Sequence, residues 1–230
     1  MKILFWNVKY FGPTSPNYDE RIRGLADLIE RFRPDIVALV ELTKNAPQVL
    51  ADLARTLTER NLAYASSTVN AGGGNDEHYV VLFAPEFGLA PPPLAVVEDE
   101  RLGGGTRKIG HVSIPGDVSD LPAFGLYICH PSPSAFTRRV ALKEAVQFVM
   151  RNGRALMVGD FNAENWEDFA AHVVAPGGAT HSGAHGDLKT IDGAVFNALT
   201  VVVETWSRPN SGGSESDHSY ILFEVSEEGE

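Results

Sequence analysis

The sequence has little cysteine, few basic residues for its acidic content, and no long apolar run. Cys129 is the only cysteine among 230 residues, so an intrachain disulfide is excluded. The apolar stretch that follows Met1 stops after four residues, and no later segment reaches the ~18 apolar residues of a membrane span. We therefore expect no membrane span and a cytoplasmic protein in a reducing compartment.

Positive charge is also scarce. Lys and Arg total 19 against 30 for Asp and Glu, which gives a net charge of −11. This balance argues against a broad, sequence-independent grip on a polyanion. A nuclease is not excluded, because an enzyme with a carboxylate cluster can be acidic overall and still present a local basic rim to phosphates.

What the sequence does have is a regular alternation of short apolar runs and amphipathic stretches. Apolar runs predict strands at 2–7, 35–41, 78–84, 94–98, 107–114, 122–129, 154–159, 190–196, 199–205 and 218–225. Helical spacing of apolar residues predicts helices at 18–32, 46–60 and 136–152, and a short helix near 165–172. Gly- and Pro-rich pieces predict loops at 70–76, 90–93, 102–106, 175–186 and 209–214.

No repeat or linker divides the chain, and 43% hydrophobic residues suffice for one sizeable core, so we expect a single domain over 1–230. Each half mixes several strands with one or two amphipathic helices. This organisation predicts an α/β protein in which two packed sheets are flanked by helices.

Polar side chains stand where several apolar strands begin or end. Asn7 and Glu41 close the first two strands, and Asp217 with His218 opens the last one. The strongest local signal is Met157-Val-Gly-Asp-Phe-Asn162, which places Asp160 and Asn162 on the same side if the backbone stays extended. Any one of these groups alone is more simply interpreted as a turn residue. Together they predict a site where strand ends converge on one rim.

These residues carry a resemblance to the endonuclease/exonuclease/phosphatase superfamily. Asn7, Glu41, Gly-Asp160-Phe-Asn162 and Ser-Asp217-His218 occur in the order and approximate spacing of that superfamily, over nearly the whole chain. The resemblance implies a four-layer α/β/β/α sandwich with two mixed sheets packed face to face.

Within the superfamily the chain looks most like the deoxyribonuclease I branch. Asn7-Val-Lys-Tyr-Phe-Gly12 resembles that branch's opening motif. Glu77 and His130 stand where the branch pairs a glutamate with a histidine, and Asp192 stands where it carries the aspartate that orients the final histidine, here His218.

The resemblance and the chemistry of phosphodiester hydrolysis imply roles for the negatively charged and amide side chains. Glu41, with Asn7 and Asp217, would hold Mg²⁺ or Mn²⁺. Asp160 would complete the cluster of carboxylates at the base of the site. Asn7 and Asn162 would hydrogen-bond a phosphoryl oxygen without adding negative charge.

The basic side chains complete the predicted set. His218, oriented by Asp192, could take a proton from the attacking water, and His130, backed by Glu77, could donate one to the leaving group; which histidine is acid and which is base stays open. Arg107 resembles the arginine that the branch places against the substrate phosphate. Lys9, Arg138 and Arg139 are further candidates for that contact.

Several remaining polar positions are better interpreted as structural. His181 and His185 lie four residues apart in a Gly-rich stretch, which we interpret as a polar loop rather than a metal site. Cys129 is expected to be inert packing. Gly193 and Ser219 depart from the residues that are usual beside Asp192 and His218, and we expect both to touch the substrate rim.

Three functions compete on these grounds. The leading hypothesis is a divalent-metal-dependent nuclease, an endonuclease acting on DNA in preference to RNA. The alternative keeps the chemistry but takes a small phosphoester such as a nucleotide, an inositol phosphate or a lipid headgroup, which the net charge favours. The third is a catalytically silent binding module. The oligomeric state is unreadable, and a monomer is presumed.

The resemblance also makes a geometric prediction. The nine side chains matched to the superfamily should line one cleft between the two sheets: Asn7, Glu41, Glu77, His130, Asp160, Asn162, Asp192, Asp217 and His218.

Overall fold

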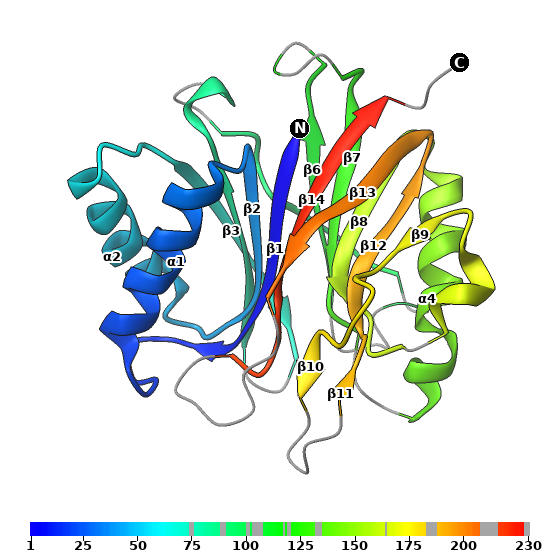
Figure 1. Ribbon diagram of the computed structural model, residues 1–230, viewed down its shortest axis with the longest axis horizontal. Helices are drawn as coiled ribbons and strands as arrows, with labels where there is room; N and C mark the ends of the chain where they lie inside the picture. The colour runs from blue at the N-terminus through cyan, green and yellow to red at the C-terminus, as the bar shows by residue number, and fades with distance from the viewer. Residues whose placement is uncertain are drawn as a thin grey trace.

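Two six-stranded mixed sheets lie at the centre of the protein, with helices on their outer faces (Figure 1). The computed structural model describes residues 1–73, 76–87, 91–99, 102, 108–116, 118, 121–131, 135–163, 165–182, 188–207 and 216–227; the side chains of 135–139 and 188 are outside this description. Among the described residues, no helix is long and apolar enough to cross a membrane.

The first sheet has the strand order β13-β14-β1-β2-β4-β3. Its strands are β1 (Lys2–Phe11), β2 (Ile36–Leu42), β3 (Ala65–Gly72), β4 (Glu77–Phe83), β13 (Leu199–Trp206) and β14 (Tyr220–Glu227). The second sheet has the order β5-β6-β7-β8-β12-β9. Its strands are β5 (Ala95–Val97), β6 (Ile109–Ile114), β7 (Phe124–Cys129), β8 (Ala155–Asp160), β9 (Val173–Val174) and β12 (Asp192–Asn197).

Successive side chains of each strand point to opposite faces of its sheet, and this alternation produces the layers. Ile3 and Phe5 of β1 enter the core shared by the two sheets, whereas Leu4 between them packs toward α1 (Tyr18–Phe32) and α2 (Ala46–Glu59). In the second sheet Leu126 and Ile128 enter the shared core, while Tyr127 packs with residues of α4 (Ala135–Arg151). Helices therefore cover both outer faces, and the predicted α/β/β/α sandwich is confirmed.

Two local predictions were wrong, and one strand was not predicted. β3 is an edge strand paired with β4, although its sequence Ala-Ser-Ser-Thr-Val-Asn-Ala-Gly lacks an apolar run, because an edge strand beside a loop buries little of its surface. The stretch 175–186, predicted as loop, contributes β10 (His181–Ser182), which pairs with β11 (Leu188–Lys189). The helix expected near 165–172 is a 3-10 turn, η2 (Trp166–Phe169).

One end of the sandwich collects the polar strand termini. β1 runs parallel to β2, and β7 runs parallel to β8. A hydrogen bond from Asn7 of β1 to Asp160 of β8 shows that the carboxyl ends of both pairs lie at the same end. Their neighbours β4, β12 and β14 run antiparallel to them and therefore begin at the same end. The β10–β11 ribbon projects from this end, opposite the N-terminus (Figure 1).

Candidate active site

Asp160 stands at the centre of a buried polar cluster. The Nδ2 group of Asn7 donates to Asp160 Oδ2 and to Glu41 Oε1, both at 3.1 Å. His130 Nε2 lies 3.4 Å and His218 Nε2 lies 3.7 Å from the same Asp160 oxygen. Asn7 belongs to the first sheet and Asp160 to the second, so the cluster joins the ends of the two sheets.

Local backbone distortions orient the side chains of Asn7 and Glu41 toward the cluster. β1 shifts register against β2 between Asn7 and Phe11, and Lys9 within that bulge has φ 44°. Glu41 has φ 62°, at a second register shift between β2 and β4. A left-handed conformation costs a non-glycine residue about 1–2 kcal/mol, and bulges of this kind re-aim side chains next to sites.

Each histidine of the cluster is held by a buried carboxylate. His130 Nδ1 donates to Glu77 Oε1 at 2.8 Å, and Glu77 Oε1 also accepts the Glu41 N–H at 3.2 Å. His218 Nδ1 donates to Asp192, with its two oxygens at 3.1 and 3.2 Å. These hydrogen bonds leave the Nε2 atom of each ring facing Asp160.

The pKa values of the pairs reflect burial and charge. Burial by itself lowers the pKa of His218, but the charges of Asp192 and Asp160 outweigh it and raise this pKa to about 10. Burial raises the pKa of Asp192 to about 6, with the positive charge of His218 opposing that effect. For His130, burial again lowers the pKa, and the charge and hydrogen bond of Glu77 reverse it, so the net shift is upward.

Two hydroxyl groups hold the backbone of the Asp192–His218 pair in place. Thr180 Oγ1 accepts the N–H groups of Ile191 and Asp192, both at 3.0 Å. Ser216 Oγ donates to the Asn7 carbonyl at 2.6 Å and accepts the His218 N–H at 3.1 Å. Thr180 was not singled out from the sequence, since only the tertiary fold brings it beside its partners, whereas Ser216 opens the Ser-Asp-His motif.

The contacts join all nine matched residues into one cluster, but two orientations differ from expectation. Asn162 has φ 53°, its N–H donates to Asp160 Oδ1, and its side chain donates to the Pro131 carbonyl at 3.2 Å. The assumption of an extended backbone there was wrong. Asn7 turns its amide nitrogen to the site, because its oxygen accepts the Lys9 N–H at 3.0 Å.

Asp217 lies on the outer side of the cluster. Its side chain is 20% exposed and accepts from the Lys9 ammonium group at 2.6 Å. His181, interpreted from the sequence as part of a loop, lies beside it, with Nε2 3.7 Å from Asp217 Oδ2. Burial lowers the pKa of His181. No spacing in the sequence indicated this contact, because it depends on the isolated bridge between His181 of β10 and His218, which precedes β14.

Three groupings of side chains have ligand atoms within 4.8 Å of one another: Glu41–His130–Asp160, Asp160–Asp192–His218 and His181–Asp217–His218. Glu41 and Asp217 share none of these groupings in the described part of the chain. Arg107 lies outside the described residues, as do the side chains of Arg138 and Arg139.

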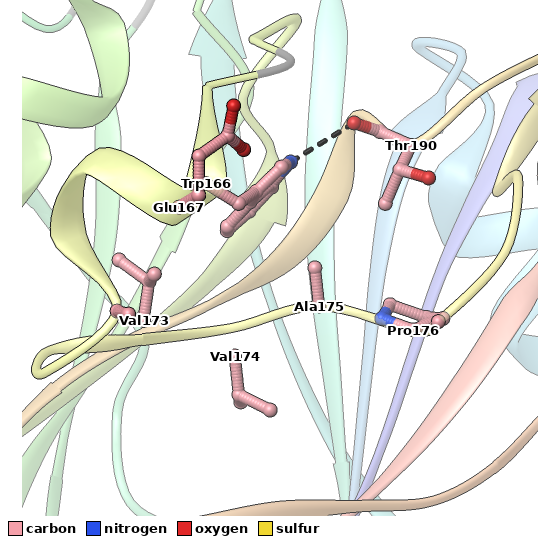
Figure 2. A pocket seen from close by; sticks show the side chains of 9 residues that line it. Trp166, Glu167, Val173, Val174, Ala175, Pro176 and Thr190 are labelled. Atoms are coloured by element: carbon pink, nitrogen blue, oxygen red, sulfur yellow. Dashed lines mark hydrogen bonds between the residues drawn. The ribbon is translucent and has the colours of Figure 1, made fainter.

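The expectation that Gly193 and Ser219 touch the substrate rim was wrong. Ser219 is fully buried. A Cβ atom on Gly193 would lie 2.5 Å from the Trp166 ring and 2.7 Å from the Val174 carbonyl, so packing accounts for this glycine. Trp166 in turn lines a hollow of about 470 Å³ whose lining contains none of the nine matched residues; Figure 2 shows its indole nitrogen donating to the Thr190 carbonyl at 2.9 Å.

Cys129, at the end of β7, is buried as expected. Burial raises the pKa of its thiol, which keeps the sulfur protonated and unreactive. The interpretation of this residue as inert packing therefore agrees with its surroundings.

Comparisons with known proteins agree with this geometry. The model of the Endonuclease/Exonuclease/phosphatase family matches residues 4–218. A search of curated proteins gave no match. Among solved structures, a humanized TDP2 from D. rerio has a TM-score of 0.64 and 16% identity, covering 97% of this chain and 98% of that one.

Two further structures are similar in fold. A family member from Leptotrichia buccalis has a TM-score of 0.63 and 17% identity, covering 98% of this chain and 99% of that one. Truncated TDP2 from Caenorhabditis elegans has a TM-score of 0.61 and 15% identity, covering 99% and 97%. Sequence identities this low support similarity of fold only. The chemistry of the site has to be inferred from its own residues.

Proposed function

The chain belongs to the endonuclease/exonuclease/phosphatase family, and from that premise we propose that it is a divalent-metal-dependent phosphodiesterase, acting as a nuclease on DNA. The motif of its opening strand and its two histidine–carboxylate pairs resemble those of the deoxyribonuclease I branch. One observation carries the proposal: His130 and His218, each held at Nδ1 by a buried carboxylate, present Nε2 to the same oxygen of Asp160.

The donor set at the centre fits Mg²⁺ or Mn²⁺. Glu41 and Asp160 are both buried, and Asn7 Nδ2 lies 3.1 Å from an oxygen of each. A positive charge stabilises buried carboxylates this close together; His130 Nε2 lies 3.3 Å from Glu41 Oε1 and 3.4 Å from Asp160 Oδ2, and hard divalent ions prefer such oxygens. Glu41 and Asp160 would hold the metal, which when bound would neutralise phosphate charge and lower the pKa of a bound water.

Asn7 and Asp217 fit other roles better than the metal-ligand role expected from the sequence. Asn7 faces the centre with a hydrogen-bond donor, which suits a phosphoryl oxygen and not a cation. Asp217 is engaged by Lys9 and groups with His181 instead of Glu41. Asn162, whose side chain donates to Pro131, would need to rotate before it could hydrogen-bond a phosphate.

The two histidines are placed for proton transfer at one reacting phosphate, since both Nε2 atoms face the same Asp160 oxygen. Each ring has one nitrogen fixed by its carboxylate and one directed to the centre, which is the arrangement that general acid–base catalysis requires. A divalent cation on Asp160 would offset part of the negative charge that raises the pKa of His218. With that pKa lowered, His218 would accept a proton from the attacking water, and His130 would donate one to the leaving oxygen. Asp192 would stabilise the imidazolium that forms on His218, and Glu77 would stabilise the imidazolium from which His130 donates its proton.

A small phosphoester is the second candidate substrate. The net charge of −11 opposes a large contact surface for a polyanion. Lys9, 49% exposed beside Asp217, offers a local positive charge that either substrate could use.

The test compares nicking of supercoiled plasmid with hydrolysis of bis-p-nitrophenyl phosphate, in Mg²⁺, Mn²⁺ or EDTA. The variants are His218→Ala and a control, His172→Ala, which removes a half-buried histidine that belongs to none of the three ligand groupings. Metal-dependent nicking that His218→Ala abolishes and His172→Ala retains supports the nuclease. Hydrolysis of the small ester with intact plasmid moves the substrate to a small phosphoester, and inactivity on both substrates favours the binding module.

A further inference from the structure

The β10–β11 ribbon brings a third histidine against the active site. His181 and His218 form an isolated antiparallel bridge, and their ring centroids are 4.6 Å apart. Backbone hydrogen bonds fix this register, because the Ser182 N–H donates to the Asp217 carbonyl at 3.0 Å and the Ser219 N–H donates to the Thr180 carbonyl at 2.7 Å. The two imidazoles are therefore held side by side by main-chain geometry.

Asp217 completes a compact set of ligand atoms with these histidines. His181 Nε2 lies 3.7 Å from Asp217 Oδ2, and His218 Nε2 lies 3.8 Å from Asp217 Oδ1. A tetrahedral zinc ion with bonds of about 2.1 Å separates its ligands by about 3.4 Å. The two observed spacings, which involve different Asp217 oxygens, exceed that value by a few tenths of an ångström. With one ligand atom from each residue, all three atoms lie within 4.8 Å of one another, so side-chain rotations would have to draw them together to bonding distance.

The surroundings of His218 match those of a metal-binding histidine. His218 Nδ1 donates to Asp192, which leaves Nε2 for a metal, and a carboxylate behind a histidine is the usual second contact of a metal ligand. Asp217 Oδ1 and His181 Nδ1 are buried and have no hydrogen-bond partner among the described residues. The Lys9 ammonium group already lies 2.6 Å from Asp217 Oδ2, so the position attracts a cation.

We infer that His181, Asp217 and His218 form a second metal site, separate from the Glu41–Asp160 pair, that takes a borderline transition-metal ion such as Zn²⁺ or Co²⁺. Two imidazoles and one carboxylate suit these ions and are poor ligands for Mg²⁺. Lys9 competes for the same carboxylate and is the residue that sets the affinity. Zn²⁺ at this site ties up His218 Nε2, so it inhibits hydrolysis; this consequence rests on the proposed function, whereas the binding does not.

The experiment measures Zn²⁺ binding by calorimetry and Co²⁺ binding by visible absorption on EDTA-stripped protein. The Glu41→Gln background weakens the first site so that the second can be measured alone. Three variants are made in the Glu41→Gln background: His181→Ala, Lys9→Met and the control His78→Ala. His78 is a half-buried histidine of β4 that belongs to none of the three ligand groupings. Zn²⁺ is also titrated against Mg²⁺-supported hydrolysis by the wild type and by His181→Ala.

We expect one equivalent of Zn²⁺ in the background. His181→Ala should weaken Zn²⁺ binding more than about tenfold and abolish the Co²⁺ absorption, because a metal ligand is lost. Lys9→Met should strengthen Zn²⁺ binding by about 1.5- to fivefold, the scale of an exposed ion pair. His78→Ala should leave the Zn²⁺ affinity and the Co²⁺ absorption unchanged.

Unchanged Zn²⁺ affinity in folded His181→Ala overturns the inference. If that variant does not fold, unchanged affinity in Lys9→Met overturns it instead. Zn²⁺ binding without any detectable hydrolase activity leaves this site standing and rejects only the proposed function.

Discussion

Asp192 lies directly opposite Asp160 in the antiparallel pairing of β12 with β8, and both side chains are buried. Like charges at opposing positions of neighbouring strands repel each other. Two histidines offset this repulsion, since His218 Nδ1 lies 3.1 Å from Asp192 Oδ2 and His130 Nε2 lies 3.4 Å from Asp160 Oδ2. The fold thus keeps negative charge concentrated at one end of the sandwich, where a divalent cation would be bound.

Asp192→Asn should lower kcat by about 10²-fold or more, because His218 loses the partner that fixes its tautomer and stabilises its protonated form. KM should change less, since Asp192 does not face the substrate. Steady-state hydrolysis in Mg²⁺ measures both constants, with the exposed carboxylate variant Asp168→Asn as control. Equal kcat in the two variants would remove His218 from the proton-transfer step.

Mg²⁺ should stabilise the folded protein, because the proposed Glu41–Asp160 site exists only when the two sheets are assembled. At a concentration a hundredfold above Kd, the gain is about 2.7 kcal/mol, or about 5–10 °C in Tm for a chain of this size. Thermal unfolding in Mg²⁺ and in EDTA measures it. Glu41→Gln should lose most of the shift; a full shift in that variant would place the cation elsewhere.

Thr180→Val should lower the free energy of unfolding by about 2–4 kcal/mol, because the N–H groups of Ile191 and Asp192 lose their buried acceptor. Valine matches threonine in shape, so the change isolates the hydroxyl. Urea unfolding measures the loss. Thr180→Ser, which keeps the oxygen, should lose much less, and equal losses in both variants would assign the effect to packing.

Gly193→Ala should destabilise the fold by about 1–3 kcal/mol, since the new methyl group would overlap Trp166. Trp166→Phe in the same chain should recover part of that loss by making room. Equilibrium unfolding distinguishes this from a role at the substrate rim, which would change kcat/KM and leave stability unaltered.

Tyr64 should make stability fall at high pH. Its hydroxyl donates to the Pro34 carbonyl at 2.6 Å, and burial, with the charge of Asp35, raises its pKa from 10 to about 12. The unfolded chain therefore releases this proton first, so the stabilisation is complete below pH 10 and is lost as the pH rises toward 12. One proton changes stability by at most about 1.4 kcal/mol per pH unit, and by less here because the side chain is only partly buried.

Tyr64→Phe provides the comparison for that pH dependence. Urea unfolding between pH 9 and pH 12 should give a shallower decline of stability in the variant, because phenylalanine has no proton to release. Identical slopes in the two proteins would assign the alkaline loss to other groups.

Much of the fold followed from periodicity alone. Apolar runs identified the buried central strands because both of their faces are covered, as with 36–42, and helical spacing identified α1 and α2 within a residue or two. β3 was missed because an edge strand needs no apolar run. The hairpin β10–β11 was missed because its two-residue strands have no period to detect.

The choice of candidate side chains could be made from the sequence, because carboxylates, amides and histidines recur in a fixed order at the ends of apolar strands. How those groups face one another depends on the tertiary structure. The Asn7 amide points its nitrogen inward because a bulge brings the Lys9 N–H to its oxygen, and His181 joins the site because strand register sets it beside His218. Both arrangements depend on contacts between residues distant in the chain, or on backbone angles that no local pattern encodes.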